Sequence, residues 1–201
     1  MKTLTGFESQ DCGNGYPFWV SRLPETLIFT PAQFDELWQM HPQEYHEIKI
    51  HGRLVKTPRW QQAYGTDYHY TGRVNVALPV PSLLAPLLTW ARETIDERLN
   101  GLLLNFYDGN LGHYIGRHRD STKNMINGAP IVTMSFGEER IFRIRPWRAE
   151  HEGARIDHRA TNGSVFVMAY ETNQAFTHEV PASSTRRGRR ISVTLRGFAQ
   201  S

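Results

Sequence analysis

Residues 190–196 alternate strictly between polar and apolar side chains, in the order Arg-Ile-Ser-Val-Thr-Leu-Arg. Successive side chains of a β-strand point to opposite faces, so Arg190 and Arg196 share one face with the hydroxyls between them. The other face is aliphatic. Burying two arginines is costly unless an anion lies nearby. The segment therefore predicts a strand that turns its arginines toward an anionic ligand.

Short strand candidates follow one another after Gly101, with Gly, Pro and Asn residues between them. They cover residues 102–107, 131–136, 140–144, 155–159, 165–170 and 190–198. Several short strands in succession are typical of a β-sandwich or jelly roll. We therefore expect an α+β protein whose jelly-roll core occupies residues 101–201.

The first half of the chain carries mainly helix, hairpin and aromatic signals. A helix is predicted to start at residues 30–31 and a longer amphipathic helix to occupy residues 81–100. A hairpin with a glycine at its turn is expected over residues 48–55. Residues 1–15 are polar and lack periodicity, which predicts a loose arm. We expect the helices to flank the β-core, so that residues 1–201 form a single domain.

Length and composition bound the class of protein. The chain has 201 residues and a formal net charge of +3, which permits a nucleic-acid partner without establishing one. A single cysteine, Cys12, excludes an intrachain disulfide and a cysteine-rich zinc site. The sequence shows neither a membrane-spanning apolar stretch nor a signal pattern. We expect a monomer without a membrane partner, located in the cytoplasm, or in the nucleus if the source is eukaryotic.

A metal site is indicated by His118 and Asp120, which are two positions apart. In extended backbone they point to the same face and can bind one ion. His178 follows a hydrophobic run and could be a third ligand. Two histidines and one carboxylate with open positions form the ligand set of non-haem Fe(II) oxygenases. The alternative is a surface histidine beside an aspartate in a basic loop, which contributes little.

Asn105 and Tyr107 are also two positions apart, on the first strand of the predicted core. An amide and a phenol can both donate hydrogen bonds to carboxylate oxygens. Together with Arg190 and Arg196 they could hold a small dicarboxylate at both ends. The alternative is that Asn105 lies in a turn and Tyr107 is a core aromatic.

A wider set of motifs carries a family resemblance. In chain order they are Asn105-Phe106-Tyr107, His118-x-Asp120, Ala129-Pro130-Ile131-Val132-x-x-Ser135-Phe136-Gly137, His178 and Arg190-x-x-x-x-x-Arg196. This set resembles the AlkB family of Fe(II)- and 2-oxoglutarate-dependent dioxygenases, over the chain from Ile48 onward. The family resemblance implies a double-stranded β-helix fold, the jelly roll expected above.

The resemblance extends to residues 46–80. There, Pro58-Arg59-x-Gln61 and Tyr68-x-Tyr70-x-Gly72 look like the nucleotide-recognition segment of the family's DNA-repair members. The members concerned are those similar to the duplex-DNA repair homologue. The resemblance implies that Tyr70 and the ring of His118 sandwich a base flipped out of its stack. A packed surface pair of Tyr68 and Tyr70 is the alternative.

The resemblance also implies roles for the predicted site residues. His118, Asp120 and His178 would hold Fe(II). Arg190 and Tyr107 would bind the distal carboxylate of 2-oxoglutarate. The remaining residues would lie near its metal-chelating end: Arg196 and Asn105, with Ser192 in support.

Two positions depart from the repair members. Thr122 stands where an acidic residue usually contacts the damaged base, which leaves the preferred base open. His51 stands at the hairpin tip where the duplex-specific relative has an aromatic wedge, and it could fill the gap left by a flipped base or lie in a solvated turn. The basic residues near the site, Arg59 and Arg119 among them, could contact phosphates or form a solvated face.

The activity implied by the resemblance is oxidative demethylation of N-alkylated bases in DNA or RNA. With O2 and 2-oxoglutarate it would release formaldehyde, succinate and CO2. One alternative keeps the same cofactors and oxidises a protein side chain or a small molecule. Another is a nucleic-acid-binding module whose site is vestigial.

Overall fold

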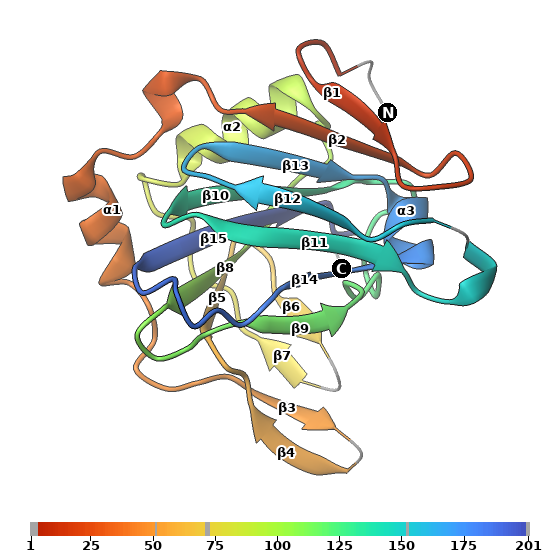
Figure 1. The fold of residues 1–201 in the computed structure, drawn as a ribbon. Coiled ribbons are helices and arrows are strands. Elements are labelled where there is room, and N and C mark those ends of the chain that lie inside the picture. The colour runs from red at the N-terminus through yellow and green to blue at the C-terminus, as the bar shows by residue number, and fades with distance from the viewer. Residues whose placement is uncertain (1–3, 51, 71–72, 152, 200–201) are drawn as a thin grey trace.

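Two antiparallel β-sheets face each other across the molecule (Figure 1). The structure is a computed structural model that describes residues 4–50, 52–70, 73–151 and 153–199. Within these residues the major sheet has the strand order β1 (Glu8–Asp11), β2 (Pro17–Arg22), β13 (Ser164–Met168), β10 (Ile131–Gly137), β15 (Arg189–Arg196), β8 (Gly101–Asp108) and β5 (Trp60–Tyr64). The minor sheet has the order β12 (Ile156–Ala160), β11 (Arg140–Pro146), β14 (Phe176–Val180) and β9 (Ile115–His118). This confirms the expected jelly roll.

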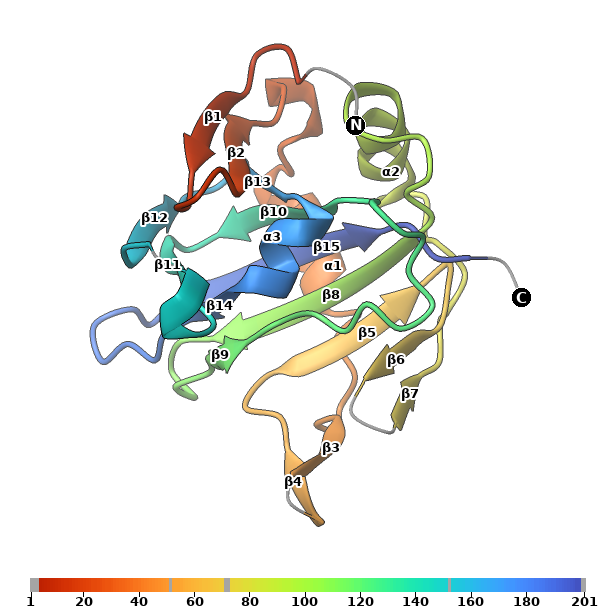
Figure 2. The same ribbon diagram turned by 90° about the vertical axis from the view of Figure 1, so that its right-hand side faces the viewer.

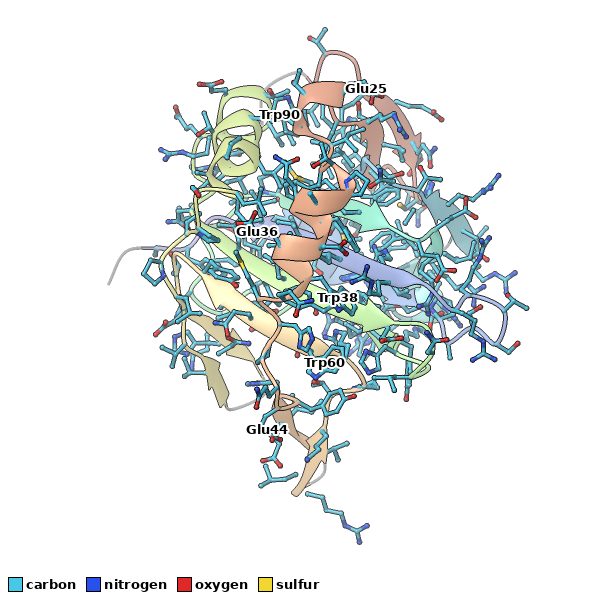
Figure 3. The ribbon with its side chains drawn as sticks, turned by 90° about the vertical axis from the view of Figure 1, so that its left-hand side faces the viewer. Glu25, Glu36, Trp38, Glu44, Trp60 and Trp90 are labelled. Carbon is cyan, nitrogen blue, oxygen red and sulfur yellow. The ribbon has the colours of Figure 1, made fainter. Side chains whose placement is uncertain are left out.

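Helices α1 (Pro31–Trp38) and α2 (Ala85–Thr94) cover the outer face of the major sheet (Figures 1 and 3). The Thr30 side chain caps α1 in a capping box with Gln33, as Thr-Pro at a helix start favours. Helix α2 is shorter than predicted, because the residues that follow Pro81 form a turn before it.

Strand β15 separates two cores. Its aliphatic side chains, such as Ile191 and Val193, pack with α1 and α2 in one apolar cluster. The opposite face looks toward the minor sheet. A second apolar cluster lies on this side, and it includes Tyr107 of β8, Phe142 of β11 and Phe176 of β14. The alternation predicted from sequence thus separates two environments: the apolar face of β15 contacts the helices, and its polar face lies between the two sheets.

Two hairpins form separate small sheets: β3 (Glu47–Ile50) with β4 (Arg53–Lys56), and β6 (Tyr68–Tyr70) with β7 (Arg73–Asn75). The first agrees with the predicted hairpin, and its Gly52 has φ +82°, a conformation that glycine adopts without strain.

A column of aromatic rings joins the β3–β4 hairpin to the major sheet, and its central ring is Trp60, which Figure 3 labels. The Trp60 ring of β5 stacks on Tyr45, with centroids 5.5 Å apart, and on His41, with centroids 4.1 Å apart. The Tyr45 hydroxyl is 2.9 Å from Nε2 of His113, a histidine that is 3% exposed. His113 is therefore part of the interior.

Other predictions differ from the structure. The loose arm expected over residues 1–15 instead contains β1, which pairs with β2 at the edge of the major sheet. Tyr170 begins the short helix α3 (Tyr170–Ala175) and does not end a strand. Strands β9 and β14 were not among the strand candidates.

Two 3-10 helices, η1 (Glu25–Leu27) and η2 (Ala149–His151), are the remaining elements of the described residues. None of the described helices is long and apolar enough to span a bilayer.

Candidate active site

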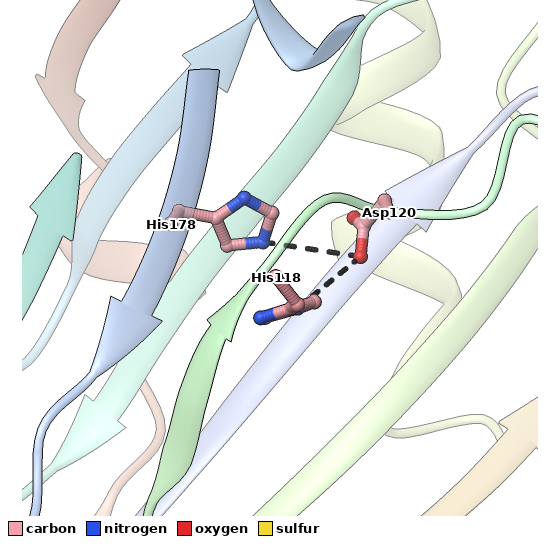
Figure 4. A group of neighbouring side chains, drawn as sticks. All are labelled: His118, Asp120 and His178. Carbon is pink, nitrogen blue, oxygen red and sulfur yellow. Dashed lines mark ion pairs between the residues drawn. The ribbon is translucent and has the colours of Figure 1, made fainter. Parts of the chain in front are cut away.

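The minor sheet brings the three predicted metal ligands together (Figure 4). His118 ends β9 and lies opposite His178 of β14 in the strand pairing, and Asp120 follows in the loop. Oδ1 of Asp120 is 3.6 Å from Nε2 of His118 and 3.8 Å from Nε2 of His178. One nitrogen or oxygen from each residue lies within 4.8 Å of the others. These separations leave room for one ion between the three atoms.

Contacts behind the ligands fix their orientation. Nδ1 of His118 is 2.9 Å from the Gly116 carbonyl, so Nδ1–H donates to it and Nε2 is free to bind a metal. Asn173 of α3 holds the backbone of Asp120 from both sides, accepting from its N–H at 2.9 Å and donating to its carbonyl at 3.0 Å. Asn173 is 1% exposed, and sequence analysis did not find it because α3 was not predicted.

The protonation states also suit a metal. Burial alone would raise the pKa of Asp120, but the Arg196 cation and the two histidines hold that pKa well below its usual range. Burial and the nearby His118 lower the pKa of His178 to about 3. An ionised carboxylate and a neutral imidazole are the forms that bind metal ions. The three residues therefore fit a divalent cation.

A central cavity lies beside this group, between the two sheets. Among the residues lining it are Arg59, Gln61, Tyr68, Asn105, Tyr107, His118, Asp120, His178, Arg190, Ser192 and Arg196. The pairing of β8 with β15 places Tyr107 opposite Arg190 and Asn105 opposite Ser192. The structure thus brings together the predicted metal and dicarboxylate residues in one cavity.

Arg190 lies at the cavity wall with an incomplete set of partners. It is 1% exposed, its Nε donates to Ser135 Oγ at 2.9 Å, and its guanidinium lies 5.0 Å from the centre of the Tyr107 ring. Its two terminal nitrogens are buried and have no hydrogen-bond partner among the described residues. A buried cation with two unused donors in fork geometry fits a carboxylate.

Asn105 is held by Gln61 of β5 and by Arg59, which immediately precedes that strand. Its Oδ1 accepts a hydrogen bond from Arg59 Nε at 2.7 Å and another from Gln61 Nε2 at 3.0 Å. Because both bonds go to the oxygen, we infer that the amide presents its NH2 group as donor to a ligand. Arg59 is 4% exposed and lines the cavity, where it contacts Asn105, so it does not belong to a solvated face.

Removing the Gln61 amide should loosen Asn105. Gln61→Leu is expected to raise the apparent KM for 2-oxoglutarate about two- to tenfold, the value of one hydrogen bond of about 0.5–1.5 kcal/mol. Gln62→Leu is the matched control, because Gln62 donates to the carbonyls of Ala63 and Val76 instead. Steady-state turnover at varied 2-oxoglutarate measures both variants. Equal KM values for the two variants would contradict the positioning role of Gln61.

Arg196 connects the cavity to the metal ligands. Its guanidinium donates to Asp120 Oδ2 at 2.5 Å and lies 4.6 Å from the centre of the Tyr68 ring. Tyr68 is 4% exposed and meets the Phe198 ring edge-on. Tyr68 is therefore a packed aromatic residue that also lines the cavity.

The other substrate-binding candidates are placed in different ways. Arg119 and Thr122 line an open groove beside the metal ligands, outside the central cavity. The side chain of Tyr70 and all of His51 lie outside the described residues. Several other arginines near the site pair with acids: Arg143 with Asp157, Arg145 with Glu179, Arg186 with Glu139 and Arg189 with Asp35.

Comparison with known proteins gives one family and several relatives. The 2OG-Fe(II) oxygenase superfamily matches residues 23–196. The protein named DNA oxidative demethylase ALKBH2 of Bos taurus is 28% identical over 188 residues, covering 85% of this chain and 66% of the bovine protein, just under two thirds of its length. The Homo sapiens protein of the same name is 26% identical over 186 residues, covering 85% of this chain and 71% of that protein.

A third relative and a solved structure are also similar to this chain. The alpha-ketoglutarate-dependent dioxygenase alkB homolog 3 of Rattus norvegicus is 28% identical over 149 residues, covering 69% of this chain and 50% of that protein. The solved structure titled "The structure of OsALKBH1" has a TM-score of 0.56 at 13% identity and covers 96% of this chain and 100% of that one, which supports the fold. With its ligand triad and buried arginine in one cavity, the chain belongs to the 2OG-Fe(II) oxygenase superfamily, and its relatives there are AlkB homologues.

Proposed function

We propose that this protein uses Fe(II), 2-oxoglutarate and O2 to demethylate N-alkylated bases in DNA. The observation that carries the oxygenase chemistry is the shared cavity of the His118–Asp120–His178 group and the unsatisfied guanidinium of Arg190. The choice of an alkylated base is supported by the relatives named DNA oxidative demethylase. We further propose that it acts as a monomer in the compartment that holds the DNA.

The protein residues have separate tasks in this proposal. Bound Fe(II) would supply the activation of O2 that is needed to oxidise the N-methyl carbon. His118, Asp120 and His178 would hold the metal through two imidazoles and one carboxylate. Arg190 fixes one carboxylate of 2-oxoglutarate, and Asn105 donates to the same molecule from β8. Both sheets shield the reacting atoms from water, since the cavity residues Arg190 and Asp120 are less than 10% exposed.

The direct test is incubation with Fe(II), 2-oxoglutarate, ascorbate and a panel of methylated oligonucleotides. Mass spectrometry should show loss of the methyl group, with formaldehyde and succinate formed in equal amounts. Unmethylated oligonucleotides of the same sequences are the controls. Succinate formation without demethylation of any oligonucleotide would place the protein among oxygenases with another substrate.

One observation favours a second function, the oxidation of a protein side chain or small molecule. Thr122 offers a hydroxyl beside the metal ligands and no charge, so it cannot form a charge-assisted bond with the exocyclic amine of a base. The same incubation with Thr122→Glu separates the two functions. A Thr122→Glu variant that gains demethylase activity where the wild type has none would support the second function for this chain.

Tyr70 tests whether a flipped base enters the site. It ends β6 and is paired with Arg73 of β7. Tyr70→Ala is expected to lower kcat/KM for a methylated oligonucleotide about tenfold to a hundredfold, the loss of about 1–3 kcal/mol of stacking. Decarboxylation of 2-oxoglutarate in the absence of substrate reports on the metal and cosubstrate separately. A parallel fall in both activities would argue against a stacking role.

A further inference from the structure

An open groove lies next to the metal ligands, lined by residues of β9, of the segments that follow β9 and β11, and of α3. Figure 2 shows the ribbon of these segments. There α3 lies in front, between the end of β11 and the segment that follows β9. The groove includes His118 and Asp120 of the metal site. Its other lining residues include Arg117, Arg119, Thr122, Trp147, Asn173 and Gln174.

Trp147 and Arg119 form a fixed pair in this groove. The Arg119 guanidinium lies 4.5 Å from the centre of the Trp147 ring, and its Nη1 donates to the Gln174 carbonyl at 2.8 Å. The Trp147 backbone N–H donates to the Ala175 carbonyl at 2.8 Å, yet Trp147 remains 39% exposed. A large aromatic ring held by its backbone and partly open to solvent is a ready stacking surface.

The charge of the groove distinguishes it from the rest of the surface near the site. Arg119 and Arg117 contact neutral partners there: carbonyl groups, and for Arg117 also Thr177 Oγ at 2.8 Å. The other arginine clusters nearby are largely neutralised by acids, as described above. Within the described residues the acid in the groove lining is Asp120, which pairs with Arg196. The groove therefore offers uncompensated positive charge together with an exposed ring.

We propose that Trp147 and Arg119 form a platform for a nucleotide next to the one whose base enters the metal site. The base of that neighbouring nucleotide stacks on Trp147, and Arg119 contacts its phosphate. A ligand that is polyanionic and carries flat rings matches both features, as single-stranded nucleic acid does. The platform rests on the proposed function and adds to it a second point of contact along the strand.

The test compares a methylated oligonucleotide of about twelve nucleotides with a methylated mononucleotide, which lacks the neighbouring nucleotide, since a single-stranded binding site spans about 4–16 nucleotides. For Trp147→Ala, the ratio of kcat/KM for the long substrate over the short one should fall about tenfold to a hundredfold relative to the wild type. Trp147→Phe keeps an aromatic face and should recover most of this ratio. Trp90→Phe is the control: Trp90 of α2 stacks on Phe7, on the outer face of the major sheet, and its loss should leave the ratio unchanged.

Salt dependence tests the charge. Arg119→Gln should reduce the slope of log binding constant against log salt by about one, measured by fluorescence anisotropy with the same oligonucleotide. A wild type that demethylates the long substrate while Trp147→Ala keeps its ratio overturns the platform alone. A wild type that demethylates neither substrate overturns the proposed function and the platform with it. If Arg119→Gln and Trp147→Ala bind the oligonucleotide as tightly as the wild type does but differ from it in turnover of a peptide, the groove would be assigned to a protein substrate.

Discussion

Replacing His178 with alanine is expected to abolish oxygen-dependent conversion of 2-oxoglutarate to succinate. The change removes one of three metal ligands, so the loss should exceed the 10- to 100-fold cost typical of an outer-shell partner, that is, more than about 100-fold. His178 is the informative choice among the ligands. It is held neutral by burial, whereas removing Asp120 would leave the buried Arg196 cation without its carboxylate.

Two measurements accompany this variant. Succinate formation reports turnover, and the shift in melting temperature on adding Mn(II) in place of Fe(II) reports metal binding. His158→Ala is the control, because His158 of β12 is another partly buried histidine, packed 5.0 Å from the Phe18 ring. It should lower the melting temperature and preserve turnover. Wild-type succinate formation by His178→Ala would show that the metal lies elsewhere.

Arg190→Met is expected to have opposite effects on stability and activity. Without ligand, the wild type buries a cation whose terminal nitrogens have no hydrogen-bond partner among the described residues, and burial lowers the pKa of Arg190. Replacing even a buried ion pair with apolar side chains is often neutral or stabilising, by about 1–4 kcal/mol, and a buried cation without a carboxylate partner has less electrostatic stabilisation to lose. We therefore expect an equal or higher melting temperature for ligand-free Arg190→Met. Loss of the carboxylate partner should at the same time raise the apparent KM for 2-oxoglutarate.

The size of the KM effect follows from charge-assisted hydrogen bonds, each of which contributes about 1.5–3 kcal/mol. Arg190→Lys keeps the charge but loses the bidentate geometry, so its KM should rise about tenfold to a hundredfold. Addition of 2-oxoglutarate at a hundred times its Kd should stabilise the wild type by about 2.7 kcal/mol and the variants by much less. Equal stabilisation of wild type and Arg190→Met would rule out Arg190 as the carboxylate partner.

The sequence predicted the parts of the site that depend on local alternation. Arg190 and Arg196 share a face because side chains of a strand alternate. His118 and Asp120 also lie close together, although β9 ends at His118 and Asp120 is in the loop that follows. Alternation along one strand does not predict which residue of a neighbouring strand lies opposite. The pairing of β5 with β8 places Gln61 opposite Asn105, and the hydrogen bond from Arg59 to Asn105 shows that Arg59 turns inward.

The errors in the fold have a similar cause. Residues 8–11 have no apolar periodicity, and they form β1 because β2 offers a free edge for pairing. Strand β14 carries His178 between β11 and β9, with apolar residues on either side too few to identify a strand without its neighbours. Asn173 could not be assigned to the backbone of Asp120, because the two are separated by a long stretch of chain and meet only in the folded protein.

The aromatic column at the base of the β3–β4 hairpin has a consequence for evolution. Among the residues that the structure describes, the hairpin pairs with no strand of the two large sheets, and Tyr45 and Trp60 hold its root by stacking and not by a shared hydrogen-bond ladder. Residues 47–56 can therefore be exchanged for a hairpin of another length while β5, β8 and the metal ligands keep their register. The fold thus allows substrate reach and oxidation chemistry to diversify independently, and a grafted hairpin is the natural starting point for redirecting such an enzyme.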